Sequence, residues 1–318
     1  MSTSSRPQLI YGGAGIGQEW TTRESISELL QTLESLGISR IDTAPRYPST
    51  KPGESERLLG ENGAAERGFT IDTKILVSSP GASGTLEPQA VDESLNTSYD
   101  RLRFPVGEKI NVLYCHMPDP TTPLEEQAAG LDAQYRRGRF ERLGVSNFSP
   151  DLLAQLLDIC ERNGYVKPTV VQNMYNLVDR ESEQIIPLLR KHGIAFNAYS
   201  PLAMGFLNGK LTSGDIQGTR YAEGNAMGAH ARTRYDKPKM HDAIMFLTRT
   251  LEPFNISKPE AALRWICYHS KLGSEDGVLL GASKIFQLKQ NVESIERGPL
   301  PDEVVSAIED LWKTLSES

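Results

Sequence analysis

Four residues with acid–base side chains follow short apolar runs in the first half of the chain. Asp42 lies in SRIDTAPRYP, and Tyr47 follows it five residues later. Lys74 ends the run FTIDTK, and His116 follows INVLYC. A lysine ammonium lowers the pKa of a neighbouring tyrosine by favouring phenolate, and a carboxylate keeps that lysine charged and oriented. A histidine beside them can donate a hydrogen bond to a substrate carbonyl or pass a proton to the tyrosine. Such a set would polarise a carbonyl group for attack by hydride.

Each of the four residues also has an ordinary structural explanation when it is taken alone. Asp42 with Thr43 could form a turn at a strand end, and Lys74 could be a solvated strand end. His116 could satisfy a turn, and Tyr47 could be a packed loop aromatic. The functional interpretation rests on their shared location at the ends of successive apolar runs. In a barrel of parallel strands these ends converge on one face, where active sites are built.

The elements that must position these residues alternate regularly along the chain. Short apolar runs, read as strands, are separated by longer amphipathic segments, read as helices, which is typical of parallel βαβ units. Eight such units predict a closed (β/α)8 or TIM barrel, and the absence of a linker predicts one domain over residues 1–318. The predicted strands are Leu9–Gly12, Arg40–Thr43, Phe69–Ile75, Ile110–Cys115, Arg142–Ser146, Thr169–Gln172, Ile194–Tyr199 and Gly277–Gly281.

Helix ends are signalled at several positions. Thr21 with Glu24 predicts a capping box, and Ser149 before Pro150 predicts a capped helix start. The stretch from Met204 to Lys239 lacks periodicity, which predicts a long loop after the seventh strand, on the active-site face. Other predicted helices cover 87–102, 124–138, 180–192, 258–271 and 284–296, with an extra C-terminal helix over 301–315.

The composition, 38% hydrophobic and 24% charged, is that of a soluble globular protein. A net charge of −7 argues against a nucleic-acid surface, and no apolar run approaches the ~20 residues of a membrane span. The N-terminus lacks a secretory signal, and three cysteines without metal or redox spacing read as buried apolar fillers in a reducing compartment. We therefore predict a cytoplasmic protein without nucleic-acid or membrane partners. The remaining histidines show no ligand spacing, so no metal is predicted.

Hydride chemistry requires a cofactor, but the usual dinucleotide fingerprint does not follow the first strand. GGAGIG at 12–17 has suitable glycines, yet the next helix is predicted to begin only at about Thr22. A nicotinamide cofactor would therefore bind by another route, across the barrel mouth.

A series of motifs resembles the aldo-keto reductases along nearly the whole chain. In order they are IDTAPRY, DTK, LYCHMPD, LGVSNF, VVQNMYN, AYSPLAMGFLNGK and GASKIFQLKQN. HMPDPTTPLEE, NGYVKPTVVQNMYN and TRYAEGN are most similar to the aflatoxin-aldehyde and succinic-semialdehyde reductase branch. The resemblance implies NADPH-dependent reduction of aldehydes and ketones to alcohols by a monomer or homodimer acting on a small-molecule carbonyl substrate. It also implies a catalytic tetrad of Asp42, Tyr47, Lys74 and His116, with Tyr47 as general acid.

The resemblance further implies a cofactor site. Ser146, Asn147 and Gln172 would hydrogen-bond the nicotinamide carboxamide, and Tyr199 would stack on its ring. Asn147 and Gln172 could otherwise make ordinary loop-end hydrogen bonds. Residues 200–210 would follow the pyrophosphate, and the helix after the eighth strand would hold the adenosine end. The predicted cofactor residues are Gly13, Ala14, Asp42, Ser146, Asn147, Gln172, Tyr199, Ser200, Pro201, Leu202, Gly205, Leu207, Lys210, Arg220, Gly281, Ser283, Gln287, Gln290 and Asn291.

One departure concerns the 2′-phosphate that distinguishes NADPH from NADH. Many family members have arginine where this chain has Gln287, and a neutral glutamine forms no charge-assisted pair. The branch that the chain resembles also has glutamine there and uses NADPH. Arg220, aided by Ser283, could supply the cation, unless it is a mobile surface arginine. We predict NADPH (NADP+).

The substrate pocket is predicted at the barrel mouth, beside Tyr47 and His116. Trp20, Met204 and Tyr221 would form an apolar wall. Arg46 or Arg234 could attract a substrate carboxylate, although both could equally be solvated.

Two other functions remain open at this point. The chain could be a cofactor-loaded binding subunit similar to potassium-channel β subunits, although it begins almost directly at the first strand, without an N-terminal extension. It could also be an aldolase or isomerase that uses Lys74 as a Schiff base. Asp42, which should keep Lys74 charged, argues against that chemistry.

Overall fold

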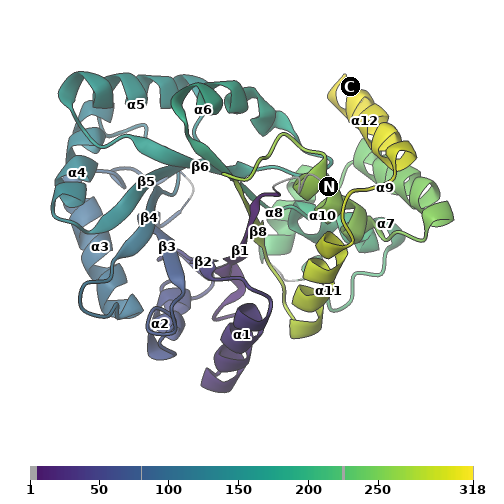
Figure 1. The fold of residues 1–318 in the computed structure, drawn as a ribbon, viewed down its shortest axis with the longest axis horizontal. Coiled ribbons are helices and arrows are strands. Elements are labelled where there is room, and N and C mark those ends of the chain that lie inside the picture. Colours follow the sequence, from purple (N-terminus) through teal and green to yellow (C-terminus); the bar gives the residue numbers. More distant parts are fainter. Residues whose placement is uncertain (1–5, 80, 224–225, 318) are drawn as a thin grey trace.

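Strands β1 to β8 close into a parallel barrel in the computed structural model, which describes residues 6–79, 81–223 and 226–317. Each strand pairs with the next along the chain, and β8 closes the barrel against β1, with Gln8 opposite Gly277 (Figure 1). The predicted (β/α)8 barrel is therefore confirmed. The strands are β1 (Gln8–Gly12), β2 (Arg40–Asp42), β3 (Thr70–Lys74), β4 (Ile110–Cys115), β5 (Phe140–Ser146), β6 (Pro168–Met174), β7 (Ala195–Tyr199) and β8 (Gly277–Leu280).

Helices follow the strands around the outside of the barrel. Figure 1 shows the early helices along one side and the helices from α7 onward gathered beside β8. The predicted extra C-terminal helix is α12, which packs against α9. The α-helices are α1 (Arg23–Ser35), α2 (Glu54–Glu61), α3 (Pro88–Leu102), α4 (Leu124–Arg136), α5 (Pro150–Asn163), α6 (Ile186–His192), α7 (Lys210–Ser213), α8 (Ala226–Tyr235), α9 (Pro238–Leu251), α10 (Lys258–Tyr268), α11 (Ile285–Glu296) and α12 (Asp302–Ser316). The 3-10 helices are η1 (Gly13–Gly15), η2 (Glu181–Ile185), η3 (Ala203–Asn208) and η4 (Glu252–Phe254).

One of the two predicted helix caps is confirmed, and the other is wrong by one residue. Ser149 caps α5, because its hydroxyl accepts a hydrogen bond from the Leu152 amide at 3.2 Å. The capping box of α1 is formed by Thr22 and Ser25, whose side chains each accept from the backbone amide of the other. The serine hydroxyl takes the role that we assigned to Glu24, so the helix begins later than Thr21 predicts.

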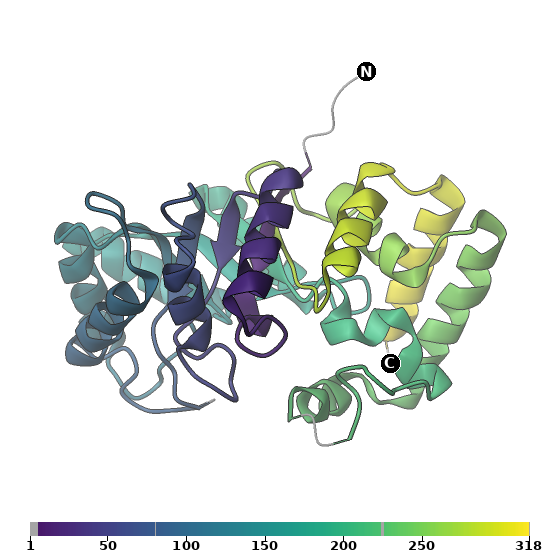
Figure 2. The same ribbon diagram turned by 90° about the horizontal axis from the view of Figure 1, so that it is seen from below.

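The stretch from Met204 to Lys239, predicted as a long loop, does follow β7, but much of it is helical rather than irregular. It contains most of η3, all of α7 and α8 and the start of α9, and the Phe206 ring stacks on Tyr235 with centroids 5.3 Å apart. In Figure 2 the connection from β7 to β8 extends to the side of the barrel where the chain leaves β1. The apolar residues that pack here are irregularly spaced in the sequence, so they show no helical periodicity and the helices were not predicted. Gly224 and Asn225, the end of TRYAEGN, lie outside the described residues.

Helix α2 was missed for a different reason. Its sequence, ESERLLGE, reads as polar, but Ser55 and Glu56 are fully buried. Glu56 accepts a hydrogen bond from the Thr73 hydroxyl at 2.7 Å, and the Ser55 hydroxyl lies 2.7 Å from that of Thr43. Polar partners on the neighbouring strands make this burial possible, and such partners are invisible in a local pattern.

The apolar core lies mainly between the strands and the helices, with a smaller cluster of Val112, Tyr114 and Val170. Polar groups are also buried on the strands, including an ion pair between Arg40 and Asp72 at 2.8 Å.

The three cysteines are free and buried, as predicted for apolar fillers. Burial raises the pKa of the Cys115 thiol to about 12, so it is not a reactive thiolate. Within the described residues, no helix has the length and apolar character needed to span a membrane. No cluster of three or more potential metal-binding side chains occurs in that part of the chain either.

Candidate active site

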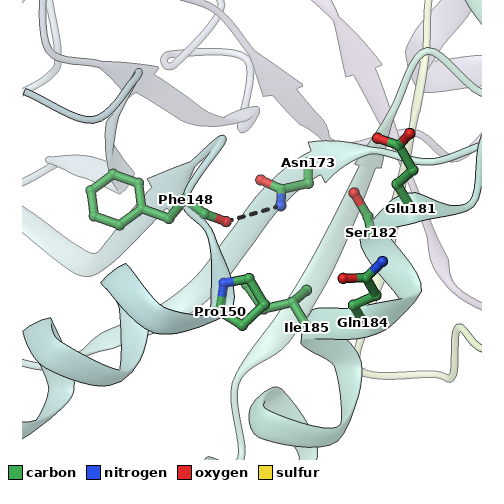
Figure 3. Close-up of a pocket in the computed structure, with 7 residues that line it drawn as sticks. All are labelled: Phe148, Pro150, Asn173, Glu181, Ser182, Gln184 and Ile185. Carbon is green, nitrogen blue, oxygen red and sulfur yellow. Dashed lines mark hydrogen bonds between the residues drawn. The ribbon is translucent and has the colours of Figure 1, made fainter.

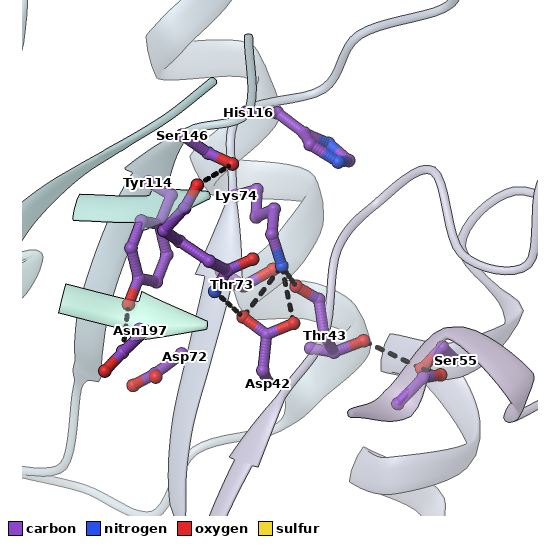
Figure 4. Close-up of polar contacts among 12 residues, drawn as sticks. Asp42, Thr43, Ser55, Asp72, Thr73, Lys74, Tyr114, His116, Ser146 and Asn197 are labelled. Atoms are coloured by element: carbon purple, nitrogen blue, oxygen red, sulfur yellow. Dashed lines mark hydrogen bonds and ion pairs between the residues drawn. The ribbon is translucent and has the colours of Figure 1, made fainter. Parts of the chain in front are cut away.

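The centre of the site is a buried ion pair between the ends of β2 and β3 (Figure 4). Lys74 Nζ donates to the two carboxylate oxygens of Asp42 at 2.8 and 2.6 Å, and to the Thr43 carbonyl at 3.0 Å. The two charged side chains are only 1% and 2% exposed. Burial is the largest single influence and lowers the pKa of Lys74, but the charges of Asp42, Tyr47 and Asp72 and the hydrogen bonds to Asp42 together raise it by more. The net direction is upward, so the lysine stays an ammonium.

Register explains why these two side chains meet. Asp42 pairs with Asp72 across β2 and β3, and Lys74 lies two residues beyond Asp72. Because side chains alternate along a strand, Lys74 points to the same side as Asp72.

Tyr47 joins this pair from the loop between β2 and α2. Its ring centroid lies 5.0 Å from Lys74 Nζ, and its ring meets the His116 ring edge-on, with centroids 5.6 Å apart. Tyr47 and His116 keep some exposed surface, whereas Asp42 and Lys74 do not. All four predicted acid–base residues are therefore brought together.

The expected lowering of the Tyr47 pKa is wrong for this state. Burial raises the pKa of the hydroxyl, and the Lys74 ammonium lowers it without reversing the upward shift. Asp42, which neutralises Lys74, also raises the pKa of Tyr47. At neutral pH Tyr47 is thus a protonated phenol, which is the form that a proton donor requires.

His116 is neutral in this environment. Burial, together with the positive charges of Lys74 and Arg46, lowers its pKa to about 3. Its Nδ1 atom is buried and has no hydrogen-bond partner among the described residues. A neutral imidazole has one N–H group, which can donate a hydrogen bond to a substrate oxygen without carrying charge.

A chain of hydrogen bonds joins the ends of β5, β6 and β7 to this centre. Tyr199 OH donates to Asn147 Oδ1 at 2.8 Å, and Asn147 Nδ2 donates to Ser146 Oγ at 3.1 Å. Ser146 Oγ donates to the Gln172 carbonyl at 2.7 Å, and Gln172 Nε2 donates to Asp42 Oδ1 at 2.8 Å. These residues make ordinary hydrogen bonds here, but the hydroxyl and two amides are also the donors and acceptors that bind a carboxamide. The donor set fits a nicotinamide amide, and its role stays a prediction.

The segment predicted to follow the pyrophosphate has an unusual backbone. Ser200 and Met204 both have φ of 56°, in the left-handed region that non-glycine residues rarely adopt. Leu207 is fully buried in the core, so this predicted cofactor residue presents no surface to a ligand in this structure. Lys210 Nζ lies 3.4 Å from the Asp215 carboxylate, which partly neutralises the cation predicted for a phosphate.

At the predicted adenosine end, Gln287 already has a partner. Its Oε1 accepts from the Ser283 amide at 3.1 Å and from the Ser283 hydroxyl at 2.9 Å. These two residues flank the start of α11, and Gln290 is exposed further along that helix. Arg220 is exposed, and its contact with a 2′-phosphate stays a prediction. The other residues predicted for the cofactor are buried Pro201, half-buried Leu202, Gly205 and Asn291, and exposed Ala14 and Gly281.

Gly13 is required by the approach of the loop after β1 to the end of β2. A Cβ atom at Gly13 would lie 2.8 Å from the Asp42 carbonyl oxygen. The Gly13 carbonyl itself accepts a hydrogen bond from Ser55 Oγ at 3.0 Å. Any side chain here would therefore displace the strand end that carries Asp42.

The predicted substrate wall is less open than expected. Trp20 and Tyr221 are only 5% and 1% exposed, so neither forms an open wall in this structure. The Trp20 indole donates to the Ala282 carbonyl at 3.3 Å, and Met204 is half-buried. These side chains instead pack within the loops around the barrel mouth.

The two candidate arginines differ in their surroundings. Arg234 is ion-paired with Asp179, with 2.6 Å between its Nε and a carboxylate oxygen. Arg46 donates to the Val77 carbonyl at 3.3 Å, and its charge lowers the pKa of His116. Arg46 therefore lies beside the catalytic centre, whereas Arg234 is ion-paired with Asp179 and its side chain is still 40% exposed.

A cavity of about 160 Å³ lies beside the hydrogen-bonded chain at the ends of β5 and β6 (Figure 3). Asn173, on β6, is hydrogen-bonded to the segment that follows β5. Its Oδ1 accepts from the Asn147 amide at 2.7 Å, and its Nδ2 donates to the Phe148 carbonyl at 3.5 Å. None of the four acid–base residues lines it. The lining residues are Phe148, Pro150, Asn173, Glu181, Ser182, Gln184 and Ile185.

Two residues of this region were missed at the sequence level. Asn173 supports the backbone of Asn147, and no local signal marks it. Tyr114 lies 5.7 Å from Lys74 Nζ, measured to its ring centroid. The alternation of side chains along a strand could have identified Tyr114, because it lies on β4 two residues before His116, which directly follows that strand.

Known proteins are similar to this chain over most of its length. Residues 8–313 match the sequence model of a family described as "Aldo/keto reductase family". Aflatoxin B1 aldehyde reductase member 2 of Mus musculus is 33% identical over 322 residues, covering 98% of this chain and 86% of the relative. Aldo-keto reductase family 7 member A3 of Homo sapiens is 34% identical, covering 97% and 94%. Oxidoreductase sirO of Leptosphaeria maculans is 32% identical, covering 100% and 98%.

Proposed function

Because the chain belongs to the aldo/keto reductase family, as its motifs predicted, we propose that it reduces aldehydes or ketones to alcohols with NADPH. The observation that carries the proposal is the Lys74 ammonium held against the Asp42 carboxylate and 5.0 Å from the Tyr47 ring. Relatives named as aldehyde reductases support an aldehyde as the substrate. Family membership supports an oxidoreductase and leaves the choice between NADPH and NADH to experiment.

Tyr47 is the proposed general acid. When bound, NADPH would supply the hydride that forms the new C–H bond at the carbonyl carbon. Tyr47 donates its proton to the carbonyl oxygen as the C=O π bond breaks, which leaves a phenolate. The nearby Lys74 ammonium stabilises that phenolate, and Asp42 keeps Lys74 charged. A proton from solvent then restores the phenol.

His116 is proposed to place the substrate carbonyl. Its neutral imidazole lies edge-on to the Tyr47 ring, so a substrate oxygen near the phenol would also be within reach of the imidazole. Because burial keeps the pKa of His116 far below neutral, the imidazole donates a hydrogen bond without competing as an acid.

The cofactor-binding roles are proposals of the same kind. Ser146, Asn147 and Gln172 would hold the carboxamide through their hydroxyl and amide groups, and Tyr199 would offer its ring face. The start of α11, with Ser283 and Gln287, would receive the adenosine end. We further propose a cytoplasmic enzyme with one domain over residues 1–318, active as a monomer or homodimer.

The test is the loss of NADPH absorbance with 4-nitrobenzaldehyde or succinic semialdehyde, with NADH as the comparison cofactor. We expect turnover with NADPH and slower turnover with NADH. A folded, NADPH-loaded protein that turns over neither aldehyde at any pH would overturn the proposal. If that protein also captured a membrane partner in stoichiometric amount, the result would favour a binding subunit.

A further inference from the structure

Lys74 Nζ lies near a second tyrosine ring besides that of Tyr47. The Tyr114 ring centroid is 5.7 Å from Nζ, within the distance at which an aromatic face attracts a cation. Tyr114 belongs to β4, next to β3, and its side chain is 0% exposed. In Figure 4 it lies beside the Lys74–Asp42 pair, with its hydroxyl directed toward Asn197.

The Tyr114 ring is fixed at both ends. Asn197 Nδ2 donates to the Tyr114 hydroxyl at 2.8 Å. On the next strand, residue 144 is glycine, and a Cβ atom there would lie 2.4 Å from the ring. A Cβ atom at Gly277 would likewise lie 2.4 Å from Asn197 Oδ1. Two glycines therefore make room for a tyrosine–asparagine pair across the barrel, which holds the ring in one place.

We infer that Tyr114 is a positioning residue, whose ring helps to hold Lys74 charged and directed at Asp42 and Tyr47. The inference rests on the proposed function, in which Lys74 stabilises the Tyr47 phenolate. Lys74 is removed from water, so a ring face replaces part of the hydration that its ammonium has lost. Tyr114 acts through Lys74 and makes no contact with the substrate in this scheme.

Other charged or titratable groups surround Lys74, and substitutions at Tyr114 or Val170 leave all of them in place. They come from β2, the loop after it, β3 and the loop after β4, and are Arg40, Asp42, Arg46, Tyr47, Asp72 and His116.

The experiment compares Tyr114→Leu, Tyr114→Phe and Val170→Ala. Val170 packs in the same buried cluster as Tyr114, so Val170→Ala controls for lost packing. For Tyr114→Leu we expect kcat to fall about tenfold, with KM and NADPH affinity nearly unchanged. The alkaline limb of its kcat–pH profile, where Lys74 loses its proton, should move to lower pH by about half a unit to one unit. The reason is that the Lys74 ammonium has lost a stabilising contact. Tyr114→Phe keeps the ring and should recover most of the loss, whereas Val170→Ala should lower Tm without moving the pH profile.

The outcomes separate this inference from the proposed function. Wild-type turnover combined with an unchanged kcat and pH profile in Tyr114→Leu would overturn the inference alone. If the wild-type protein shows no turnover, the proposed function fails, and the pKa of Lys74 is then read from the ¹³Cε resonance of labelled lysine in the free protein. An equal Lys74 pKa in wild type and variant would again overturn the inference. Tyr114→Met, which has no ring but a flexible side chain, replaces Tyr114→Leu if that variant does not fold.

Discussion

Gln172 and Asp42 are 130 residues apart in the chain, yet a 2.8 Å hydrogen bond joins the amide of Gln172 to the carboxylate of Asp42. The carboxylate that orients Lys74 is therefore also held by a residue predicted to bind the cofactor. This contact couples the two parts of the site, because a change at Gln172 reaches both.

Gln172→Met should consequently affect catalysis as well as cofactor binding. Removing the amide donor leaves Asp42 with one fewer hydrogen bond, so we expect kcat to fall about tenfold and NADPH to bind more weakly. Steady-state kinetics and a fluorescence titration with NADPH measure the two effects. Weaker NADPH binding with an unchanged kcat would show that Asp42 does not need this contact.

Tyr47→Phe should keep NADPH affinity and lose most turnover. The variant removes the hydroxyl that donates the proton, and general acid catalysis contributes about 10²- to 10⁴-fold. The matched control is Tyr135→Phe, an exposed tyrosine on α4, which should behave as wild type. Undiminished kcat in Tyr47→Phe would mean that another group supplies the proton.

The buried ion pair should also matter for folding. Lys74→Met leaves the Asp42 carboxylate buried without its cation, so we expect a loss of about 3–5 kcal/mol in the free energy of unfolding. Asp42→Asn combined with Lys74→Met removes both charges and should recover part of that loss. Urea denaturation measures both variants, and a Lys74→Met protein as stable as wild type would contradict this account.

His116 predicts a particular pH dependence of stability. Its pKa is lowered from 6.5 to about 3 in the folded protein, so the unfolded chain binds a proton first as pH falls. The contribution is complete above pH ~6.5 and is lost toward pH ~3, at up to about 1.4 kcal/mol per pH unit. We expect His116→Gln to lose less stability than wild type between neutral and acid pH, as measured by urea denaturation. Parallel stability curves for the two proteins would show that His116 does not titrate in this way.

Gly144→Ala should destabilise the barrel, because its new Cβ would lie 2.4 Å from the Tyr114 ring. Overpacking of this kind costs about 1–3 kcal/mol. Gly12→Ala is the matched control, since the nearest atom to a Cβ atom there would be 3.6 Å away. Thermal unfolding should separate the two variants, and equal Tm values would argue against the tight fit of the ring.

Much of the fold could be predicted from local patterns. The ends of β2, β3 and β4 were predicted to within one residue, because the apolar runs stop there. The missed elements are held by contacts with residues far away in the sequence, and a local pattern does not reveal such contacts. Helix α2 buries Glu56 against Thr73, and the segment around α8 packs through Phe206 and Tyr235.

The candidate site divides in the same way. The sequence identified the four acid–base residues but gave the wrong direction for the Tyr47 pKa. A lysine near the tyrosine could be inferred from the motifs, whereas the burial that raises this pKa by more than Lys74 lowers it could not. Partners far apart in the chain were also invisible, including Asp179 beside Arg234.

The sequence by itself determined the eight strands in order, most of the helices between them, the family and the chemical types gathered at the strand ends, because these follow from local period and motif. Only the tertiary structure decided which side chains contact one another. Examples are the hydrogen bond from Gln172 to Asp42 and the Tyr114 ring near the Lys74 ammonium. The tertiary structure also decided how strongly burial shifts each pKa. Desolvation and long-range hydrogen bonds depend on what surrounds an atom in space, and closure of the barrel sets those surroundings.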